Sequence, residues 1–182
     1  MKKILILTIL IAAFFSSCKK VDDAQNNSDH AALTTMILTF KQAGTIKYTA
    51  TFNDPDGIGG ANPIQFDTIK LNANQTYQAE LVLQNKTGGT TKDMTAEIRT
   101  AGREHEFFYT PTNVSIGIVK TDVDILGYPL GFNTNWQTNA ATTTNTATVK
   151  VQLKHKPFNK GPNDDASKGH DDININFPII IN

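Results

Sequence analysis

Four stretches of the chain alternate apolar and polar residues with a period of two. They are Ile46 to Phe52, Tyr77 to Leu83, Ala147 to Leu153 and Ile173 to Ile181. In an extended strand every second side chain lies on the same face, so each stretch predicts a β-strand with one buried face. We therefore expect Val151 and Leu153 to point into a core. Their neighbours Lys150, Gln152 and Lys154 should face water.

Five further segments combine strand-forming residues with flanking turn residues. They are Leu33 to Phe40, Phe66 to Leu71, Glu106 to Tyr109, Val114 to Lys120 and Gly131 to Thr138. Together with the first four they predict about nine short strands. Pro178 lies inside the last apolar run, which predicts an edge strand or a bulge because proline cannot donate to a sheet ladder. Trp136, the only tryptophan, is expected in the core between the sheets.

One segment, from Thr91 to Arg103, has a helical rather than a strand-like spacing. Its apolar residues Met94, Ile98 and Ala101 recur at the intervals of a helix face, which predicts a short helix. Strands and helices do not alternate along the chain, so a parallel sheet is not expected. The predicted fold class is mainly β, an antiparallel two-sheet β-sandwich of immunoglobulin-like or jelly-roll type with one short helix.

The first residues have the organisation of a bacterial secretion signal. A short basic start precedes an apolar run from Ile4 to Phe15, and two small residues stand directly before Cys18. The run is shorter than the roughly 20 residues that a membrane span needs, which favours a cleaved signal peptide over residues 1–17. The pattern predicts that Cys18 is lipidated and becomes the mature N-terminus. Secretion with a free Cys18 is the alternative.

The remaining chain divides into a tether and one domain. Residues 18–32 are polar without periodicity, which predicts a disordered tether. Residues 33–182 are numerous enough for one β-sandwich domain with its own core. The chain has 17 basic and 17 acidic residues and no basic cluster, so nucleic acid is not an expected partner. With a single cysteine, no disulfide within the chain is expected.

Residues able to carry chemistry are few. The chain has no nucleophile elbow, no zinc-protease helix motif and no phosphate-binding glycine loop. No catalytic residue and no enzymatic activity are therefore predicted. Histidines and carboxylates gather at Glu104 to Glu106, at His155 and at His170 to Asp172, and these groupings are the candidates for binding.

Two of these groupings are expected to meet. Counting by two from Leu153 puts His155 on the inner face at the end of its strand. Counting back by two from Ile173 puts Asp171 on the inner face at the start of the last strand. If the two strands are antiparallel neighbours, His155 and Asp171 meet at one rim, with His170 and Asp172 alongside. Imidazole and carboxylate groups at this rim could bind Zn²⁺ or Cu²⁺. A structural hydrogen bond from His155 is the alternative.

Two loops rich in carboxylates are candidates for a hard cation. Asp54 and Asp56 stand in one loop before several glycines, and Asp122 and Asp124 precede Gly127 with the spacing that begins a calcium loop. The second loop lacks the bidentate glutamate of an EF-hand. A turn closed by aspartate side chains is the alternative for both loops. Beyond a divalent metal, no cofactor is predicted.

Several short motifs stand in a fixed order along residues 33–182. They are the Asp54–Gly57 loop, the Met94–Ile98 helix, Glu104–Phe108, Asp122–Gly131, Leu153–Pro157 and Asp172–Phe177. In this order and spacing the chain resembles a family of small, uncharacterised outer-membrane lipoproteins of Gram-negative bacteria. Such proteins sometimes carry the label "type 1 periplasmic binding fold superfamily protein". The label implies a two-domain α/β receptor, which the strand pattern does not support.

The resemblance implies a location rather than an activity. It implies attachment to the outer membrane through the lipid on Cys18. The Lys19-Lys20-Val21-Asp22-Asp23 segment resembles leaders of lipoproteins that are exported to the cell surface. The Asp67-Thr68-Ile69 segment resembles an O-glycan acceptor, with Thr68 as the modified residue.

One main functional expectation follows. We expect a lipid-anchored outer-membrane protein, facing the cell surface or the periplasm. It would act as a non-enzymatic binding or structural module for an unknown small molecule, glycan or protein. The alternative is a metal-binding lipoprotein that uses His and Asp residues at one rim of the sandwich. A hydrolase, suggested only by histidines near carboxylates, is the third hypothesis.

Overall fold

The computed structural model describes residues 33–57, 61–87, 89–156 and 160–182. The predicted signal peptide and tether lie outside these ranges. Within them the chain forms strands and one short helix: β1 (Thr35–Gln42), β2 (Thr45–Asn53), β3 (Gln65–Phe66), β4 (Ile69–Leu71), β5 (Thr76–Thr87), β6 (Thr90–Asp93), α1 (Thr95–Thr100), β7 (His105–Thr112), β8 (Ile116–Lys120), β9 (Asn133–Thr138), β10 (Thr148–His155) and β11 (His170–Ile181). No helix in these described ranges is long and apolar enough to cross a membrane.

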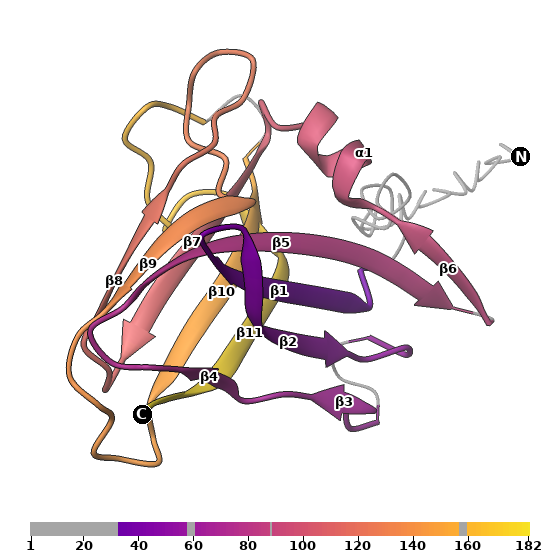
Figure 1. Ribbon diagram of the computed structural model, residues 1–182. Coiled ribbons are helices and arrows are strands. Elements are labelled where there is room, and N and C mark those ends of the chain that lie inside the picture. Colours follow the sequence, from indigo (N-terminus) through magenta and orange to yellow (C-terminus); the bar gives the residue numbers. More distant parts are fainter. Residues whose placement is uncertain (1–32, 58–60, 88, 157–159) are drawn as a thin grey trace, which may run out of the picture. The chain divides into compact units, whose positions relative to one another are not determined.

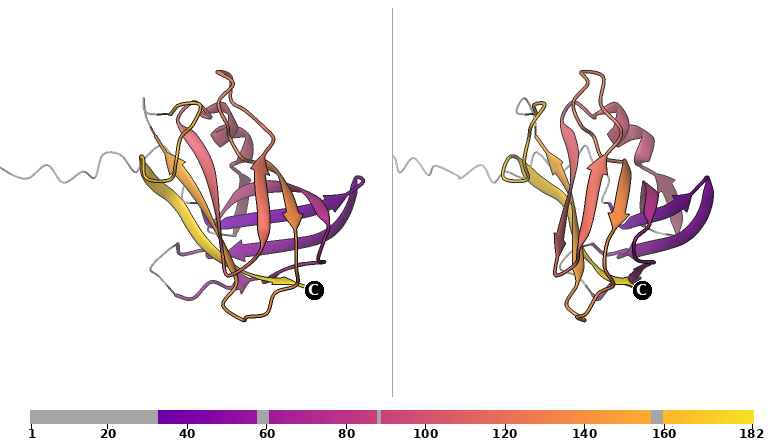
Figure 2. Two further views of the ribbon diagram at one scale, coloured as in Figure 1. Left: turned by 90° about the vertical axis from the view of Figure 1, so that its left-hand side faces the viewer. Right: turned by 60° about the vertical axis from the view of Figure 1, so that its left-hand side comes forward.

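The strands form two sheets that enclose one core (Figure 1). The first sheet has the order β3-β2-β1-β5-β9-β8, with β6 paired to β5. The second has the order β4-β11-β10-β7. Figure 2 shows β1, β2 and β5 running across the strands of the second sheet. The predicted mainly-β sandwich with one short helix is confirmed, although the β4–β11 pairing is parallel.

Alternation along the strands builds the core as the sequence predicts. Val151 and Leu153 of β10 are fully buried, and so is Trp136 of β9. The indole N–H of Trp136 donates to the Thr134 hydroxyl at 2.8 Å, which satisfies the one polar group that this large side chain brings into the core. The indole ring also packs edge-on against Phe40, with 5.0 Å between the ring centroids.

Two residues on the outer face of β10 are buried, contrary to expectation. Gln152 is 6% exposed and Lys154 is 7% exposed. The Lys154 Nζ lies 2.9 Å from the Asp171 Oδ1, and the Gln152 Nε2 lies 3.3 Å from the same oxygen. The prediction that both face water is wrong, because Asp171 on the neighbouring strand gives both side chains a polar partner along the sheet.

Helix α1 is shorter than the spacing of apolar residues predicts. Residues before it form β6, which pairs with β5 as a hairpin. The carboxylate of Asp93 accepts the N–H of Thr95 at 2.8 Å at the point where the strand ends. Met94 and Ile98 are buried, so the apolar spacing is correct. The prediction erred at the N-terminal boundary because β5 offers backbone partners to the preceding residues.

Pro178 lies in an inner strand and not at a sheet edge. β11 runs between β4 and β10, and its register shift is not at Pro178. The N–H of Ile179 donates to Ala147 on the β10 side, so the Pro178 nitrogen faces the opposite side. There the pairing with β4 starts only at Ile179. The expected edge strand is therefore wrong. β11 does carry a bulge, but at Asp172 and not at Pro178, where no ladder bond is needed at the nitrogen.

We expect Leu153→Ala to lower the free energy of unfolding by about 2–5 kcal/mol, because truncation of a fully buried leucine leaves a cavity. Val119→Ala is a matched control, since Val119 is 64% exposed on β8. It should change the free energy of unfolding by about 0.5 kcal/mol or less. Urea denaturation followed by circular dichroism measures both. Equal unfolding midpoints for Leu153→Ala and the wild type would contradict the assigned core.

Candidate metal centre

Two histidines far apart in the sequence meet where β10 ends and β11 begins. His155, the last residue of β10, pairs with His170, the first residue of β11. Gly169 precedes His170 with a φ of +73°, and a Cβ at this position would lie 2.2 Å from the His155 carbonyl oxygen. Only glycine lets the chain return closely enough to place His170 beside His155.

A β-bulge decides which carboxylate faces the two histidines. Leu153 pairs with Ile173, but the next residue, Lys154, pairs with Asp171. Asp172 is therefore the extra residue on β11. Counting by two from Ile173 predicts Asp171 on the inner face. The bulge shifts that parity by one residue, so that Asp171 lies against Lys154 and Asp172 joins the histidines.

His155, His170 and Asp172 bring three ligand atoms together. One ligand atom from each residue lies within 4.8 Å of the other two. Among the described residues, this is the group of histidines and carboxylates that could hold a metal ion. The His155 Nδ1 is 3.2 Å from the His170 Nε2, which is 3.8 Å from the Asp172 Oδ1. Tetrahedral Zn²⁺ with bonds of about 2.0–2.1 Å separates its ligand atoms by about 3.3–3.4 Å. The His155–His170 spacing fits such an ion, the His170–Asp172 spacing exceeds it by roughly half an ångström, and the third pair of ligand atoms lies within 4.8 Å.

His105, the first residue of β7, and Glu104 just before it contact the atoms of Asp172 and His155 that would face away from a bound ion. His105, which is 1% exposed, has its Nε2 3.2 Å from the Asp172 Oδ2. The other ring nitrogen, Nδ1, is 2.9 Å from the carbonyl oxygen of Ala101. The Glu104 Oε2 is 3.5 Å from the His155 Nε2. Partners of this kind orient metal ligands in proteins, because they leave the opposite atom of each ligand turned toward the ion.

The surroundings favour the neutral form of His155. Burial lowers the pKa of His155, and the neighbouring His105 and His170 lower it further, against the opposing effect of Asp172 and Glu104. The His155 ring stacks on His105 with 4.8 Å between centroids and an interplanar angle of 5°. A neutral imidazole keeps the lone pair that a metal ion requires, so this environment suits a metal ligand.

Three other carboxylates predicted as metal ligands, Asp171, Asp122 and Asp124, each pair with a cation of the protein. Asp171 pairs with Lys154 at 2.9 Å, Asp122 with Arg99 at 3.1 Å and Asp124 with Lys160 at 2.9 Å. Asp124 also accepts the backbone N–H groups of Leu126 and Tyr128, which closes the turn that was the alternative to a calcium loop. The structure therefore does not bring these three carboxylates to the histidine group.

Of the two predicted modification sites, Thr68 lies in the described part of the chain and Cys18 lies outside it. Thr68 is half-buried in the connection between β3 and β4, and its carbonyl oxygen accepts the Tyr48 hydroxyl at 2.7 Å. The Asp67 carboxylate accepts the N–H of Thr51 at 2.9 Å. These contacts hold the connection against β2.

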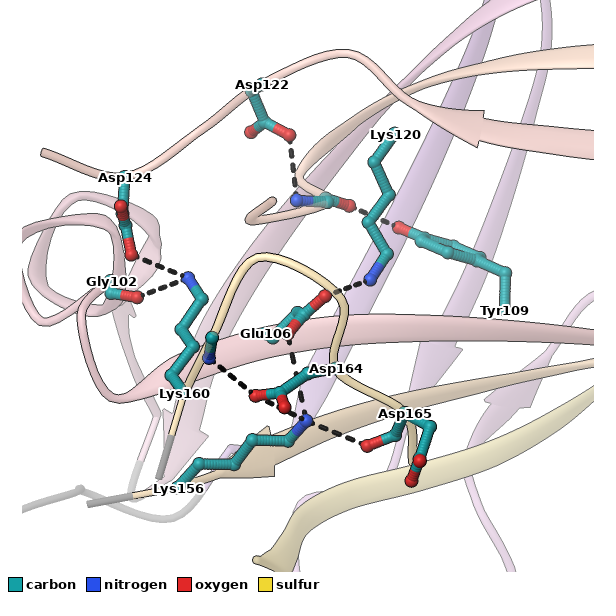
Figure 3. Close-up of polar contacts among 12 residues, drawn as sticks. Gly102, Glu106, Tyr109, Lys120, Asp122, Asp124, Lys156, Lys160, Asp164 and Asp165 are labelled. Atoms are coloured by element: carbon teal, nitrogen blue, oxygen red, sulfur yellow. Dashed lines mark hydrogen bonds and ion pairs between the residues drawn. The ribbon is translucent and has the colours of Figure 1, made fainter. Parts of the chain in front are cut away.

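A buried ionic cluster, which the sequence did not predict, surrounds Lys156 directly after β10 (Figure 3). Lys156 is fully buried, and its Nζ donates to the Asp165 carbonyl oxygen at 2.8 Å. The same Nζ lies 3.5 Å from the Asp164 Oδ2 and 3.7 Å from the Glu106 Oε2. It also lies 4.2 Å from the centroid of the Phe108 ring, a cation–π contact. No local sequence pattern marks these partners.

A second buried pair continues this cluster. The Lys160 Nζ donates to the Gly102 carbonyl oxygen at 2.7 Å and to the Asp124 Oδ2 at 2.9 Å, and both charged side chains are 1% exposed. Burial alone would raise the pKa of Asp124. The hydrogen bonds from Lys160, Tyr128 and Leu126 outweigh burial and lower this pKa. Asp124 is therefore ionised, and its charge is balanced by Lys160.

Comparisons of the chain with protein-family models, with curated proteins and with solved structures find no match. The resemblance to outer-membrane lipoproteins thus stays a prediction from the sequence motifs. The chemistry of the site has to be argued from its own geometry.

We expect Lys160→Ala to lower the free energy of unfolding by about 3–5 kcal/mol, because it leaves the buried Asp124 without its cation. Lys168→Ala is the matched control, since Lys168 also pairs with an aspartate, Asp164, at 2.7 Å, but its own side chain is 52% exposed. It should cost about 0–1 kcal/mol. Urea denaturation at neutral pH measures both.

The lowered pKa of Asp124 also predicts how stability depends on pH. Because the folded-state pKa of Asp124 lies below the ordinary aspartate value of 3.8, the stabilisation by Asp124 is present above that value and is lost as pH falls through the folded-state pKa. Lys160→Ala should lose less stability on acidification than the wild type does. Parallel acid unfolding curves for the two proteins would contradict the pairing.

Proposed function

We propose that the chain is a lipid-anchored outer-membrane protein whose β-sandwich is a non-enzymatic binding module for Zn²⁺ or Cu²⁺. The observation that carries the proposal is the convergence of His155, His170 and Asp172 within 4.8 Å. Two imidazole nitrogens and one carboxylate oxygen suit these ions better than Ca²⁺ or Mg²⁺, which prefer oxygen ligands alone.

The position of the three residues supports exchange of the ion with the surroundings. The His170 side chain is 58% exposed, whereas that of Asp172 is 13% exposed. An ion held here would lie at the rim of the sandwich, with one side on the protein and one side toward solvent. Three protein ligands leave one tetrahedral position for water or for a ligand from another molecule. Such a site suits the capture of a metal ion or a metal-bridged partner.

The alternative is a structural role without metal. The His155–His170 contact at 3.2 Å is also a good hydrogen bond, and it joins the ends of β10 and β11. A metal site and a structural hydrogen bond differ in one measurable respect. Only the metal site requires Asp172 for the binding of an added ion, so the experiment below compares Asp172 with its neighbour.

We expect the mature chain from residue 18, carrying Cys18→Ser to remove the thiol, to bind one Zn²⁺ or Cu²⁺ ion in isothermal titration calorimetry. His170→Ala should abolish this binding because it removes a ligand. Asp172→Asn should weaken it at least about 10-fold. His105→Gln should weaken it by about 10–100-fold, because His105 orients Asp172.

Asp171→Asn is the matched control for that experiment. It removes the adjacent carboxylate, which faces Lys154 at 2.9 Å, and should leave metal affinity unchanged. Metal binding that is weakened equally by Asp171→Asn and Asp172→Asn would contradict the site. Absence of binding at micromolar metal, together with reduced stability of His155→Ala, would leave only the structural hydrogen bond.

The anchoring part of the proposal has a separate test. We expect Cys18→Ser to release the full-length protein from membranes, because acyl chains supply about 0.8 kcal/mol of membrane affinity per buried CH₂ group. The soluble variant should keep the unfolding transition of the domain. Fractionation of cells with a carbonate wash measures the release. Variant protein that remains with the membrane fraction after the wash would show that Cys18 is not the anchor.

A further inference from the structure

The loop after β2 contains a buried carboxylate oxygen without a partner. Asp54 directly follows β2, where its N–H donates to the Thr34 carbonyl oxygen at 2.8 Å and its own carbonyl oxygen accepts the Gly57 N–H at 3.2 Å. These backbone bonds fix Asp54 in a position where the residue is 3% exposed. Its Oδ1 has no hydrogen-bond partner. Buried polar atoms normally have a hydrogen-bond partner, so this oxygen is a candidate ligand atom for a bound ion.

A second carboxylate approaches the first. Asp56 accepts the N–H of Ala61 at 2.7 Å, and its carboxyl group lies near enough to influence that of Asp54. Burial of Asp54, followed by the hydrogen bond with Asp56 and the charge of Asp56, raises the pKa of Asp54. A cation bound between the two carboxylates would favour the charged form of both.

Within the described residues, no lysine, arginine or histidine forms an ion pair with Asp54 or Asp56. This contrasts with Asp122, Asp124 and Asp171, each of which has a cationic partner within 3.1 Å. The pair thus combines excess negative charge with a buried oxygen that lacks a contact.

We propose that Asp54 and Asp56 bind a calcium ion that contacts the unpartnered Asp54 Oδ1. Both side chains offer only oxygen ligands, which suit a hard cation. Calcium tolerates irregular geometry and accepts carboxylates in one-oxygen or two-oxygen contact, whereas Mg²⁺ demands a near-ideal octahedron. Water completes the coordination. This calcium site is independent of the proposed Zn²⁺ or Cu²⁺ centre, which uses imidazole nitrogens.

The number of carboxylates sets the expected strength of binding. Two aspartates are fewer than the charged ligands of a high-affinity calcium loop, so a dissociation constant of about 0.1–1 mM is expected, in the range of extracellular modules. At such an affinity, millimolar calcium should raise the melting temperature of the folded domain in a saturable way, because the ion binds the folded state and not the unfolded chain.

The test is a calcium titration of the mature chain from residue 18, carrying Cys18→Ser and freed of metal with a chelator. Calorimetry and thermal unfolding should both report saturable binding of one Ca²⁺ ion. Asp54→Asn and Asp56→Asn should each weaken that binding at least about 10-fold, because each removes a charged ligand while keeping the size of the side chain. Mg²⁺ should bind more weakly than Ca²⁺.

Two controls separate this site from other effects of calcium. Glu80→Gln removes a half-exposed carboxylate that pairs with Lys41 at 2.7 Å, and it should leave Ca²⁺ binding unchanged. His155→Ala should also leave Ca²⁺ binding unchanged, whatever its effect on Zn²⁺. Absence of saturable binding up to about 10 mM Ca²⁺ would overturn the proposal. So would Asp54→Asn and Asp56→Asn proteins that bind as the wild type does, or a Glu80→Gln protein that loses binding equally.

Discussion

The pairing of β10 with β11 is the interaction on which most of the structure depends. On its inner face β10 contributes Val151 and Leu153 to the core, and at its end the pairing brings His155 beside His170. The shift in register after Leu153 makes Asp172 the extra residue of a bulge. Bulges re-aim side chains at the ends of sheets, and this one brings together the three side chains of the proposed metal site.

Next to the outer face of the same strands, charged side chains are buried. Lys156 and Lys160 have essentially no exposed side-chain surface, and each lies near carboxylates and carbonyl oxygens from other segments. Taking such groups out of water is costly unless every charge is matched. The matching partners include Asp124, before β9, and Asp164, before β11. The cluster therefore ties both of these connections to the second sheet, close to the strand ends that bear the histidines.

The two proposed ion sites differ in donor type and in the way their charge is balanced. The rim group combines imidazoles with one carboxylate, and His105 and Glu104 orient its ligands. The loop after β2 has only carboxylates, Asp54 and Asp56, with a raised pKa at the buried one. A nitrogen-rich site and an oxygen-only site discriminate between transition metals and calcium by chemistry alone. The two proposed sites would therefore respond separately to the two kinds of ion.

The sequence by itself determined the strands with clear alternation, the buried face of β10 and the position of His155 at a strand end, because alternation is a local property of an extended backbone. It could not determine that Asp172 replaces Asp171 beside the histidines. That choice depends on a bulge, which arises in the pairing of two strands and leaves no mark in the alternation of either. Nor could it identify the partners of Lys156. These come from β7 and from the connection before β11, and only the packing of the sheets decides which distant charges share one buried space.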